Sequence, residues 1–367
     1  MGFKCGIVGL PNVGKSTLFN ALLSTAQAEA ANYPFCTIEP NVGRVGVPDD
    51  RIDKLAAIAG SATIIPTQLE FVDIAGLVRG ASKGEGLGNQ FLSHIREVDA
   101  IIYVLRCFED GNITHVETSI DPMRDADIVE TELVIADLES LEKRLPNLQK
   151  KAKGGDKESI EVTAMIERVL KVVGEGHPAR MTELKDTHER RTFLNLQLLT
   201  SKPVMYVCNV DESSAAAGNS LSAKVAEMAK QKNAPCVIIS ARIEAEISTM
   251  DTQEDKNEFL ESLGLKETGL AQIIKAGYRL LDLVTYFTVG PKEARAWTIT
   301  RGTQGPAAAG VIHTDFEKGF IRAETIAYND YIAAKGEQGA KEAGKFRLEG
   351  KEYVVQDGDV LHFRFNT

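Results

Sequence analysis

Short runs of consecutive apolar residues recur through the first 240 residues, and each is typical of a buried strand. Five such runs occur, at Phe3 to Val8, Leu69 to Asp73, Ala100 to Arg106, Val204 to Asn209 and Cys236 to Ser240. Helix-like stretches separate them, as in parallel sheets that are covered on both faces. The pattern predicts an α/β domain built on a doubly wound parallel sheet.

The period of the apolar positions changes after Leu133, where a coiled-coil pattern begins. The first seam has alternating spacings of four and three, at Val134, Leu138, Leu141, Leu145 and Leu148. A turn at Gly154-Gly155-Asp156 precedes a return seam at Val162, Met165, Val169 and Val172. We therefore expect an antiparallel helical hairpin, inserted at residues 134–192, in which Pro146 kinks or locally breaks the first helix.

From residue 281 onward the pattern is one of short strands and turns. Turns are expected at Gly305-Pro306 and at Asp357 to Asp359, and Val360 to Phe365 alternates apolar and polar residues as a half-buried strand does. This predicts a small α+β, ubiquitin-like module at residues 281–367. The α/β domain then comprises residues 1–133 and 193–280.

Candidate chemistry begins at Gly9, where the spacing Gly-x-x-x-x-Gly-Lys-Ser follows the first strand and precedes a helix. Backbone N–H groups in such a loop point at phosphate oxygens, and the helix N-terminus adds partial positive charge. Lys15 is expected to reach the β- and γ-phosphates of a nucleotide, and Ser16 to bind Mg²⁺ through its hydroxyl. The other expected phosphate-loop contacts are Asn12, Val13, Gly14 and Thr17.

Two further segments suit a Mg²⁺-bound triphosphate. Asp73 ends the second apolar run and can hold a water on the metal, and the N–H of Gly76 can contact the γ-phosphate. Thr37 lies between the two motifs and can close on Mg²⁺, although an ordinary loop hydroxyl is the alternative. An Asp-x-x-Gly motif is weak alone and much stronger after a phosphate loop.

The segment Asn209 to Glu212 lies where a GTPase carries Asn-Lys-x-Asp. Val210 replaces the lysine that would lie along the base, and Glu212 replaces the aspartate that binds guanine N1–H and N2–H₂. Because glutamate is one methylene longer, its carboxylate need not reach the guanine edge, which favours adenine. Ser240 and Ala241 correspond to the Ser-Ala pair that backs the base in GTPases.

At these residues the sequence resembles the YchF, or Obg-like ATPase, family of translation-factor-class P-loop proteins. The similarity covers nearly the whole chain and includes Phe35 to Asn41, Gly84 to Phe91, the Asn-x-x-Glu at Asn209 and His313 to Phe320. The resemblance implies an OBG-type G domain, a C-terminal TGS domain, ATP preferred over GTP, and slow hydrolysis. It also implies association with ribosomes, through the large subunit.

The resemblance further implies that a histidine orients the attacking water, since Leu77 occupies the position of the usual glutamine. His115 matches by its surroundings, His94 is the rival, and either could instead be a packing or surface histidine. The family is also similar to potassium-dependent P-loop enzymes at Asn12, so K⁺ binding by the Asn12 carbonyl is left open.

The composition of the chain bears on its cellular compartment and on its partners. The net charge of −10, from 42 basic and 52 acidic residues, argues against general nucleic-acid binding. Five cysteines without a Cys-x-x-Cys pair indicate reduced thiols. No apolar run is long enough for a membrane span, and no signal peptide is evident. We expect a cytoplasmic monomer.

Two basic clusters stand out against this acidity. One lies at the hairpin tip, and the other lies in the C-terminal module at Lys341, Lys345, Arg347 and Lys351. The tip cluster comprises Lys150, Lys151, Lys153 and Lys157. Each cluster is either a solvated surface or a contact with ribosomal RNA.

Together these residues predict an ATP-hydrolysing regulatory switch. Turnover should be slow because no arginine finger is evident, and such fingers accelerate hydrolysis by about 10³–10⁵-fold. Two alternatives remain at this point: a true GTPase, and a binding scaffold in which nucleotide only stabilises the fold.

Overall fold

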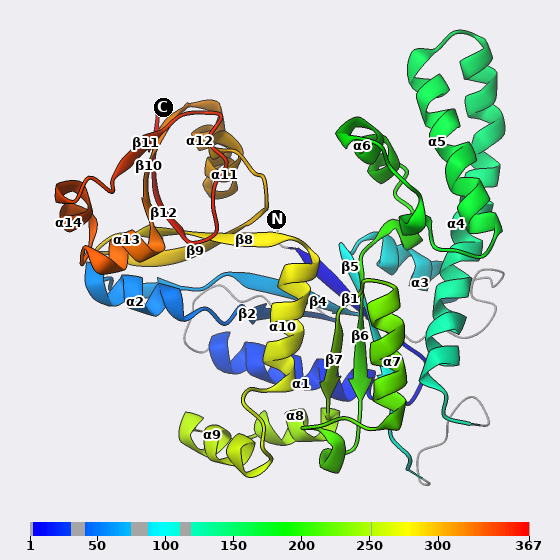
Figure 1. Cartoon of the computed structure of the whole chain (residues 1–367), viewed down its shortest axis with the longest axis horizontal. Coiled ribbons are helices and arrows are strands. Elements are labelled where there is room, and N and C mark those ends of the chain that lie inside the picture. The colour runs from blue at the N-terminus through cyan, green and yellow to red at the C-terminus, as the bar shows by residue number, and fades with distance from the viewer. Residues whose placement is uncertain (1–2, 31–40, 75–86, 111–118, 251, 367) are drawn as a thin grey trace.

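The computed structural model describes residues 3–30, 41–74, 87–110, 119–250 and 252–366. Figure 1 shows a sheet with helices on both faces, a pair of long helices that projects from it, and a second sheet built from the C-terminal part of the chain. The elements that position the candidate site all belong to the first sheet and its connections.

The first sheet has six strands in the order β2-β4-β1-β5-β6-β7. All neighbouring pairs are parallel except β2 (Val42–Gly46), which runs antiparallel to β4. The parallel strands are β1 (Lys4–Val8), β4 (Gln68–Asp73), β5 (Ala100–Arg106), β6 (Val204–Asn209) and β7 (Cys236–Ile239). They coincide with the five apolar runs, which confirms the predicted doubly wound α/β fold.

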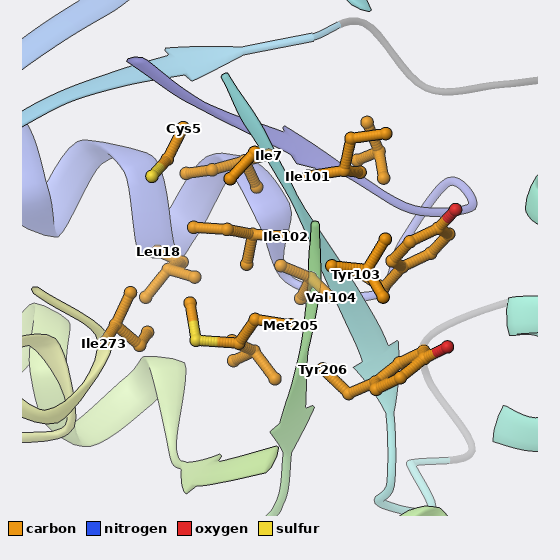
Figure 2. Close-up of a cluster of buried hydrophobic side chains, with 14 of the residues drawn as sticks. Cys5, Ile7, Leu18, Ile101, Ile102, Tyr103, Val104, Met205, Tyr206 and Ile273 are labelled. Atoms are coloured by element: carbon orange, nitrogen blue, oxygen red, sulfur yellow. The ribbon is translucent and has the colours of Figure 1, made fainter. Parts of the chain in front are cut away.

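Helices cover both faces of this sheet. On one face lie α1 (Lys15–Ala30) and α10 (Gly269–Leu280), and on the other lie α4 (Pro122–Lys153) and α7 (Ser220–Gln231). In Figure 2, Leu18 of α1 and Ile273 of α10 approach Met205, and all three are fully buried. Such two-sided burial explains why the strands read as unbroken apolar runs.

The remaining helices of this part are shorter. They are α3 (Leu87–Arg96), α8 (Ala241–Ile247) and α9 (Gln253–Ser262). The tyrosines of β5 and β6, Tyr103 and Tyr206, stack with their ring centroids 5.5 Å apart, on the side of the sheet away from Leu18. Their hydroxyl ends therefore lie toward α4 and α7.

The predicted helical hairpin is formed by α4 and α5 (Lys157–Gly174), joined by a turn at Gly154 and Gly155. The side chain of Asp156 caps α5 by accepting from the Ser159 N–H at 3.0 Å. The first helix begins at Pro122, well before residue 134, so its first turns pack on the sheet.

A kink or a local break was expected at Pro146, and the break is wrong, because α4 remains helical on both sides of this residue; the kink stays a prediction. Leu145 and Leu148 pack in the apolar cluster between α4 and α5, and this packing offsets the missing backbone hydrogen bond. Beyond the hairpin, α6 (Thr187–Asn195) lies beside α5.

The return seam also differs at one position. Met165, Ile166, Val169 and Val173 are buried against α4, whereas Val172 is only half-buried. A straight α-helix of 3.6 residues per turn drifts away from a strict coiled-coil repeat, and so the buried position shifts by one residue.

The second sheet has the order β11-β10-β12-β8-β9-β3. Its five C-terminal strands are arranged as in ubiquitin-like folds, which confirms the predicted small α+β module. They are β8 (Leu283–Val289), β9 (Glu293–Thr300), β10 (Phe320–Ala327), β11 (Arg347–Glu349) and β12 (Asp359–Phe365). The helices between them are α11 (Gly305–Ile312), α12 (Thr314–Lys318), α13 (Tyr328–Ala333) and α14 (Glu337–Glu342).

The turn expected at Gly305-Pro306 is wrong, since these residues open α11. Proline suits the first helical turn, where its missing N–H has no partner to lose. The helix places Ala308 and Ala309 in a buried cluster with Tyr286.

The sixth strand of this sheet, β3 (Thr63–Ile65), comes from the chain between β2 and β4. It pairs in parallel with β9, from Thr63 opposite Glu293 to Ile65 opposite Arg295. The preceding helix, α2 (Asp50–Ala59), packs its buried Leu55 into the cluster that contains Phe287. The C-terminal sheet is thus completed by a segment far away in sequence.

The four described cysteines, Cys5, Cys107, Cys208 and Cys236, are free thiols. Burial raises the pKa of Cys5 to about 12, so this thiol is held protonated and unreactive. Within the described residues, no helix is long and apolar enough to cross a membrane.

Candidate nucleotide-binding site

The loop from Gly9 to Gly14 connects β1 to α1 and has the tight backbone that its sequence predicts. A Cβ on Gly9 would lie 2.5 Å from the Val104 carbonyl oxygen. Gly14 has a φ of +97°, and a Cβ there would lie 2.2 Å from Nδ2 of Asn209. Both glycines are therefore required by close approach of the backbone to its neighbours.

Lys15 and Asp73 meet beside this loop. The Lys15 ammonium is buried and donates to the carbonyl oxygens of Gly9 at 3.0 Å and Leu10 at 3.1 Å. Burial lowers the pKa of Lys15, and the Asp73 carboxylate partly opposes this shift. Conversely, burial raises the pKa of Asp73 against the opposing effect of Lys15.

Asp73 reaches this position because Ile7 of β1 lies opposite Asp73 of β4 in the parallel register. Its Oδ1 atom is buried without a hydrogen-bond partner among the described residues. Because an unpaired buried carboxylate oxygen is costly, this atom is suited to accept from an ordered water. Ser16 and Thr17 lie in the first turn of α1, and both are exposed.

Asn209, at the end of β6, joins the phosphate loop to the loop that follows β7. Its Nδ2 donates to the Val13 carbonyl at 2.9 Å, and its Oδ1 accepts from the Ala241 N–H at 2.9 Å. Val210 is buried, and its N–H donates to the Ile239 carbonyl at 2.8 Å. These contacts fix the relative positions of three sheet connections.

Glu212 begins a short 3₁₀ turn that ends at Ser214. Asp211 caps this turn by accepting from the Ser214 N–H at 3.0 Å, and the Ser213 hydroxyl, which also donates to it, lowers the pKa of Asp211. The Glu212 carboxylate pairs with Nη1 of Arg242 at 3.1 Å.

One cavity of about 440 Å³ joins the end of the phosphate loop to the residues that follow β5, β6 and β7. The predicted residues that line it are Asn12, Gly14, Thr17, Asn209, Val210, Glu212, Ser240 and Ala241. The Ser240 hydroxyl is buried with no hydrogen-bond partner in the described part of the chain. A pocket with a few converging polar groups, at the carboxyl ends of parallel strands, is a typical ligand site in this fold.

Sequence reasoning missed several lining residues, namely Phe108, Glu109, Asp110, Asp211, Arg242 and Ala245. Phe108 follows β5, and the buried Arg106 guanidinium lies 4.7 Å from its ring centroid. Phe108 could have been predicted from the sequence, because the apolar run before it forms β5, which ends at the same sheet edge as β6.

Among the described site residues, the lining of this cavity does not include Val13, Lys15, Ser16 and Asp73. Thr37, Gly76, Leu77 and His115 lie outside the described residues. The rival, His94, lies half-buried in the last turn of α3. In the described segments, no group of three or more His, Cys, Asp and Glu residues could hold a metal ion.

A phosphate loop after β1, an acid at the end of β4 and a base loop after β6 define a P-loop nucleoside-triphosphate-binding protein with a GTPase-type domain. Comparison with known families agrees. A family model described as "50S ribosome-binding GTPase" matches residues 4–136. A second, YchF-GTPase_C, described as a protein of unknown function (DUF933), matches residues 283–366.

Full-length relatives identify the family. The chain is 58% identical to the ribosome-binding ATPase YchF of Haemophilus influenzae and 54% identical to that of Bacillus subtilis, over 100% of each chain. The solved structure of the Schizosaccharomyces pombe YchF GTPase is 40% identical, with a TM-score of 0.89 over 99% of this chain and 98% of that one. The chain belongs to the YchF family.

Proposed function

We propose that this chain is a Mg²⁺-dependent ATPase of the cytoplasm that binds ATP in preference to GTP and acts as a slow regulatory switch on ribosomes. The observation that carries the proposal is the cavity that joins Gly14 and Thr17 to Asn209 and Ala241. The relatives named as ribosome-binding ATPases support it.

The residues present fit a magnesium–nucleotide complex. Lys15 would neutralise the phosphates, Ser16 would hold Mg²⁺ by its hydroxyl, and the unpartnered Asp73 oxygen would accept from a metal-bound water. When bound, the ion supplies charge neutralisation along the triphosphate. Lys15 and the loop N–H groups orient the γ-phosphate for attack by water.

Calorimetric titration with non-hydrolysable ATP and GTP analogues, in buffer containing Mg²⁺ and K⁺, tests the nucleotide preference. Binding of the ATP analogue at least about tenfold tighter, or 1.4 kcal/mol, would support it. Equal or tighter binding of the GTP analogue would contradict the ATP preference and would indicate an ordinary GTPase. Phosphate release should be lost in Lys15→Ala, and retention of release would contradict the assigned active site.

The catalytic assignments complete the proposal. His115 orients the attacking water, Thr37 holds Mg²⁺ and Gly76 senses the γ-phosphate, as the family resemblance implies; Asn12 is the candidate K⁺ ligand. His115→Ala should lower the turnover rate without weakening ATP binding, whereas His94→Ala should change neither. Replacing K⁺ by Na⁺ in the same assay tests the monovalent ion.

For the ribosome, the hairpin tip is the better candidate surface. In the C-terminal cluster, Lys341, Lys345 and Arg347 already pair with Glu337, Asp330 and Glu349. The tip lysines are exposed at the end of a projecting hairpin, where they can contact phosphates. They are Lys150, Lys151, Lys153 and Lys157.

Cosedimentation with 50S subunits tests this surface. Changing the four tip lysines to alanine should weaken association and reduce its dependence on salt. The matched control changes four exposed lysines elsewhere, namely Lys54, Lys224, Lys230 and Lys292. Equal loss in both variants would show that only general charge matters.

A further inference from the structure

The base end of the cavity holds an unequal set of charges. Its described lining residues include four acidic side chains, Glu109, Asp110, Asp211 and Glu212, and one basic side chain, Arg242. Arg242 pairs with Glu212, the residue at the guanine-reading position, with 3.1 Å between Nη1 and Oε1. Asp211 cannot take the place of Glu212 in reading the base, because its carboxylate caps the 3₁₀ turn.

The backbones that carry this pair are held by buried contacts. Arg242 follows Ala241, whose N–H is bound by Asn209. Glu212 follows Asp211, whose carboxylate fixes the turn. The two side chains are 45% and 73% exposed for Glu212 and Arg242, so they remain accessible to a ligand while their starting points are fixed.

The paired and unpaired carboxylates present different surfaces to a base. A lone carboxylate offers only acceptors, and so it matches the adjacent N1–H and N2–H₂ donors of guanine. A carboxylate bound to a guanidinium offers one acceptor beside a donor. That arrangement matches adenine, which carries the N6–H₂ donor next to the N1 acceptor.

We propose that Arg242 is a specificity-determining residue, which binds Glu212 and thereby prevents its carboxylate from reading guanine. The inference rests on the proposed preference for ATP and extends it to a residue outside the Asn-x-x-Glu motif. An exposed ion pair contributes little by itself, but a base that covers the pair removes water and strengthens it. Discrimination between adenine and guanine therefore arises once the nucleotide is bound.

The test is calorimetric titration of Arg242→Ala with non-hydrolysable ATP and GTP analogues in Mg²⁺ buffer. The GTP analogue should bind about tenfold tighter than it does to the wild type, and the ATP analogue should bind more weakly. Arg301→Ala removes a similarly exposed ion pair with Asp282 and serves as the matched control. This control should keep both affinities unchanged.

A second variant pair isolates the role of the carboxylate. In a Glu212→Ala background, Arg242→Ala should no longer improve GTP binding, because no carboxylate is left to be released. If Arg242→Ala keeps the wild-type ratio of affinities, or weakens GTP binding more than ATP binding, the inference is overturned. A wild-type protein without ATP preference would instead contradict the proposed function, so the two failures are distinguishable.

Discussion

The side-chain amide of Asn209 donates to the carbonyl oxygen of Val13 at 2.9 Å, so the residue that ends β6 holds the loop that follows β1. Asn209 is only 5% exposed, and both ends of its amide are used. The residue expected to read the base is therefore also a structural link between the phosphate loop and the loop after β7.

Asn209→Ala should lose both hydrogen bonds and leave the Val13 carbonyl and the Ala241 N–H unpaired. The expected cost is about 1–3 kcal/mol of unfolding free energy for each buried group left without a partner, together with weaker nucleotide binding. Urea unfolding with and without ATP measures both effects. Asn257→Ala, which removes an exposed contact with Gln253, should be nearly neutral. A stable variant with weaker binding alone would argue against the structural link.

Gly14→Ala should abolish nucleotide binding. A Cβ would collide with the Asn209 amide at 2.2 Å, and the φ of +97° disfavours any side chain. Fluorescent-nucleotide titration measures the loss. At Gly174 a Cβ would meet nothing within 4 Å, so Gly174→Ala is the control and should bind normally. Normal binding by Gly14→Ala would contradict the close approach of Gly14 to the Asn209 amide.

The hairpin base should show a pH-dependent stability. Glu130 of α4 is bound by Arg180 and by Lys232, the latter at 2.8 Å. Burial would raise the pKa of Glu130, but the two cations outweigh it and lower the pKa below 4.5. The carboxylate's stabilising contribution is therefore fully present above pH 4.5 and is lost as the pH falls through the folded-state pKa.

Glu130→Gln should accordingly destabilise the fold by about 1–3 kcal/mol near neutral pH, with a difference from wild type that shrinks under acid conditions. Urea unfolding between about pH 2 and pH 7 measures this difference, because the loss occurs below pH 4.5. Glu139→Gln, at an exposed pair with Lys143, should have almost no effect. A pH-independent penalty would contradict the electrostatic explanation.

Leu55→Ala should destabilise the C-terminal module, although residue 55 precedes that module by more than two hundred positions. Leu55 is fully buried in the cluster with Phe287, and such truncations cost about 2–5 kcal/mol. Amide hydrogen exchange should rise in β8 and β9 before it rises in β5 and β6. Leu348→Ala, at a 58% exposed position, is the control. Uniform exchange changes would count against a separate C-terminal cluster.

Much of the site was predictable because phosphate binding constrains local spacing. Gly14 and Lys15 are recognisable from eight consecutive residues, and Asp73 and Asn209 follow because each ends an apolar run. All four lie where parallel strands deliver them to one edge of the sheet. The five parallel strands were likewise evident, since burial on both faces leaves an unbroken apolar signal.

Other features depend on contacts that local sequence does not contain. The pairing of Glu212 with Arg242 joins the 3₁₀ turn after β6 to the first turn of α8, and neither side chain has a motif that demands the other. The strand at Thr63–Ile65 is three residues long and gains its partner only from β9. At Pro146, tertiary packing keeps α4 unbroken where the local rule allowed a break. These misses share one cause, which is that distant contacts decide the local structure.

The pairing of β3 with β9 also constrains how such a chain can be rearranged by recombination. A crossover near residue 281 would transfer β9 without its neighbour and leave the backbone groups of Glu293 to Arg295 unpaired at a new sheet edge. The N-terminal part that is left behind would keep α2, with Leu55 exposed to water. We therefore expect a transferred C-terminal part to be stable only when the segment from Asp50 to Ile65 moves with it.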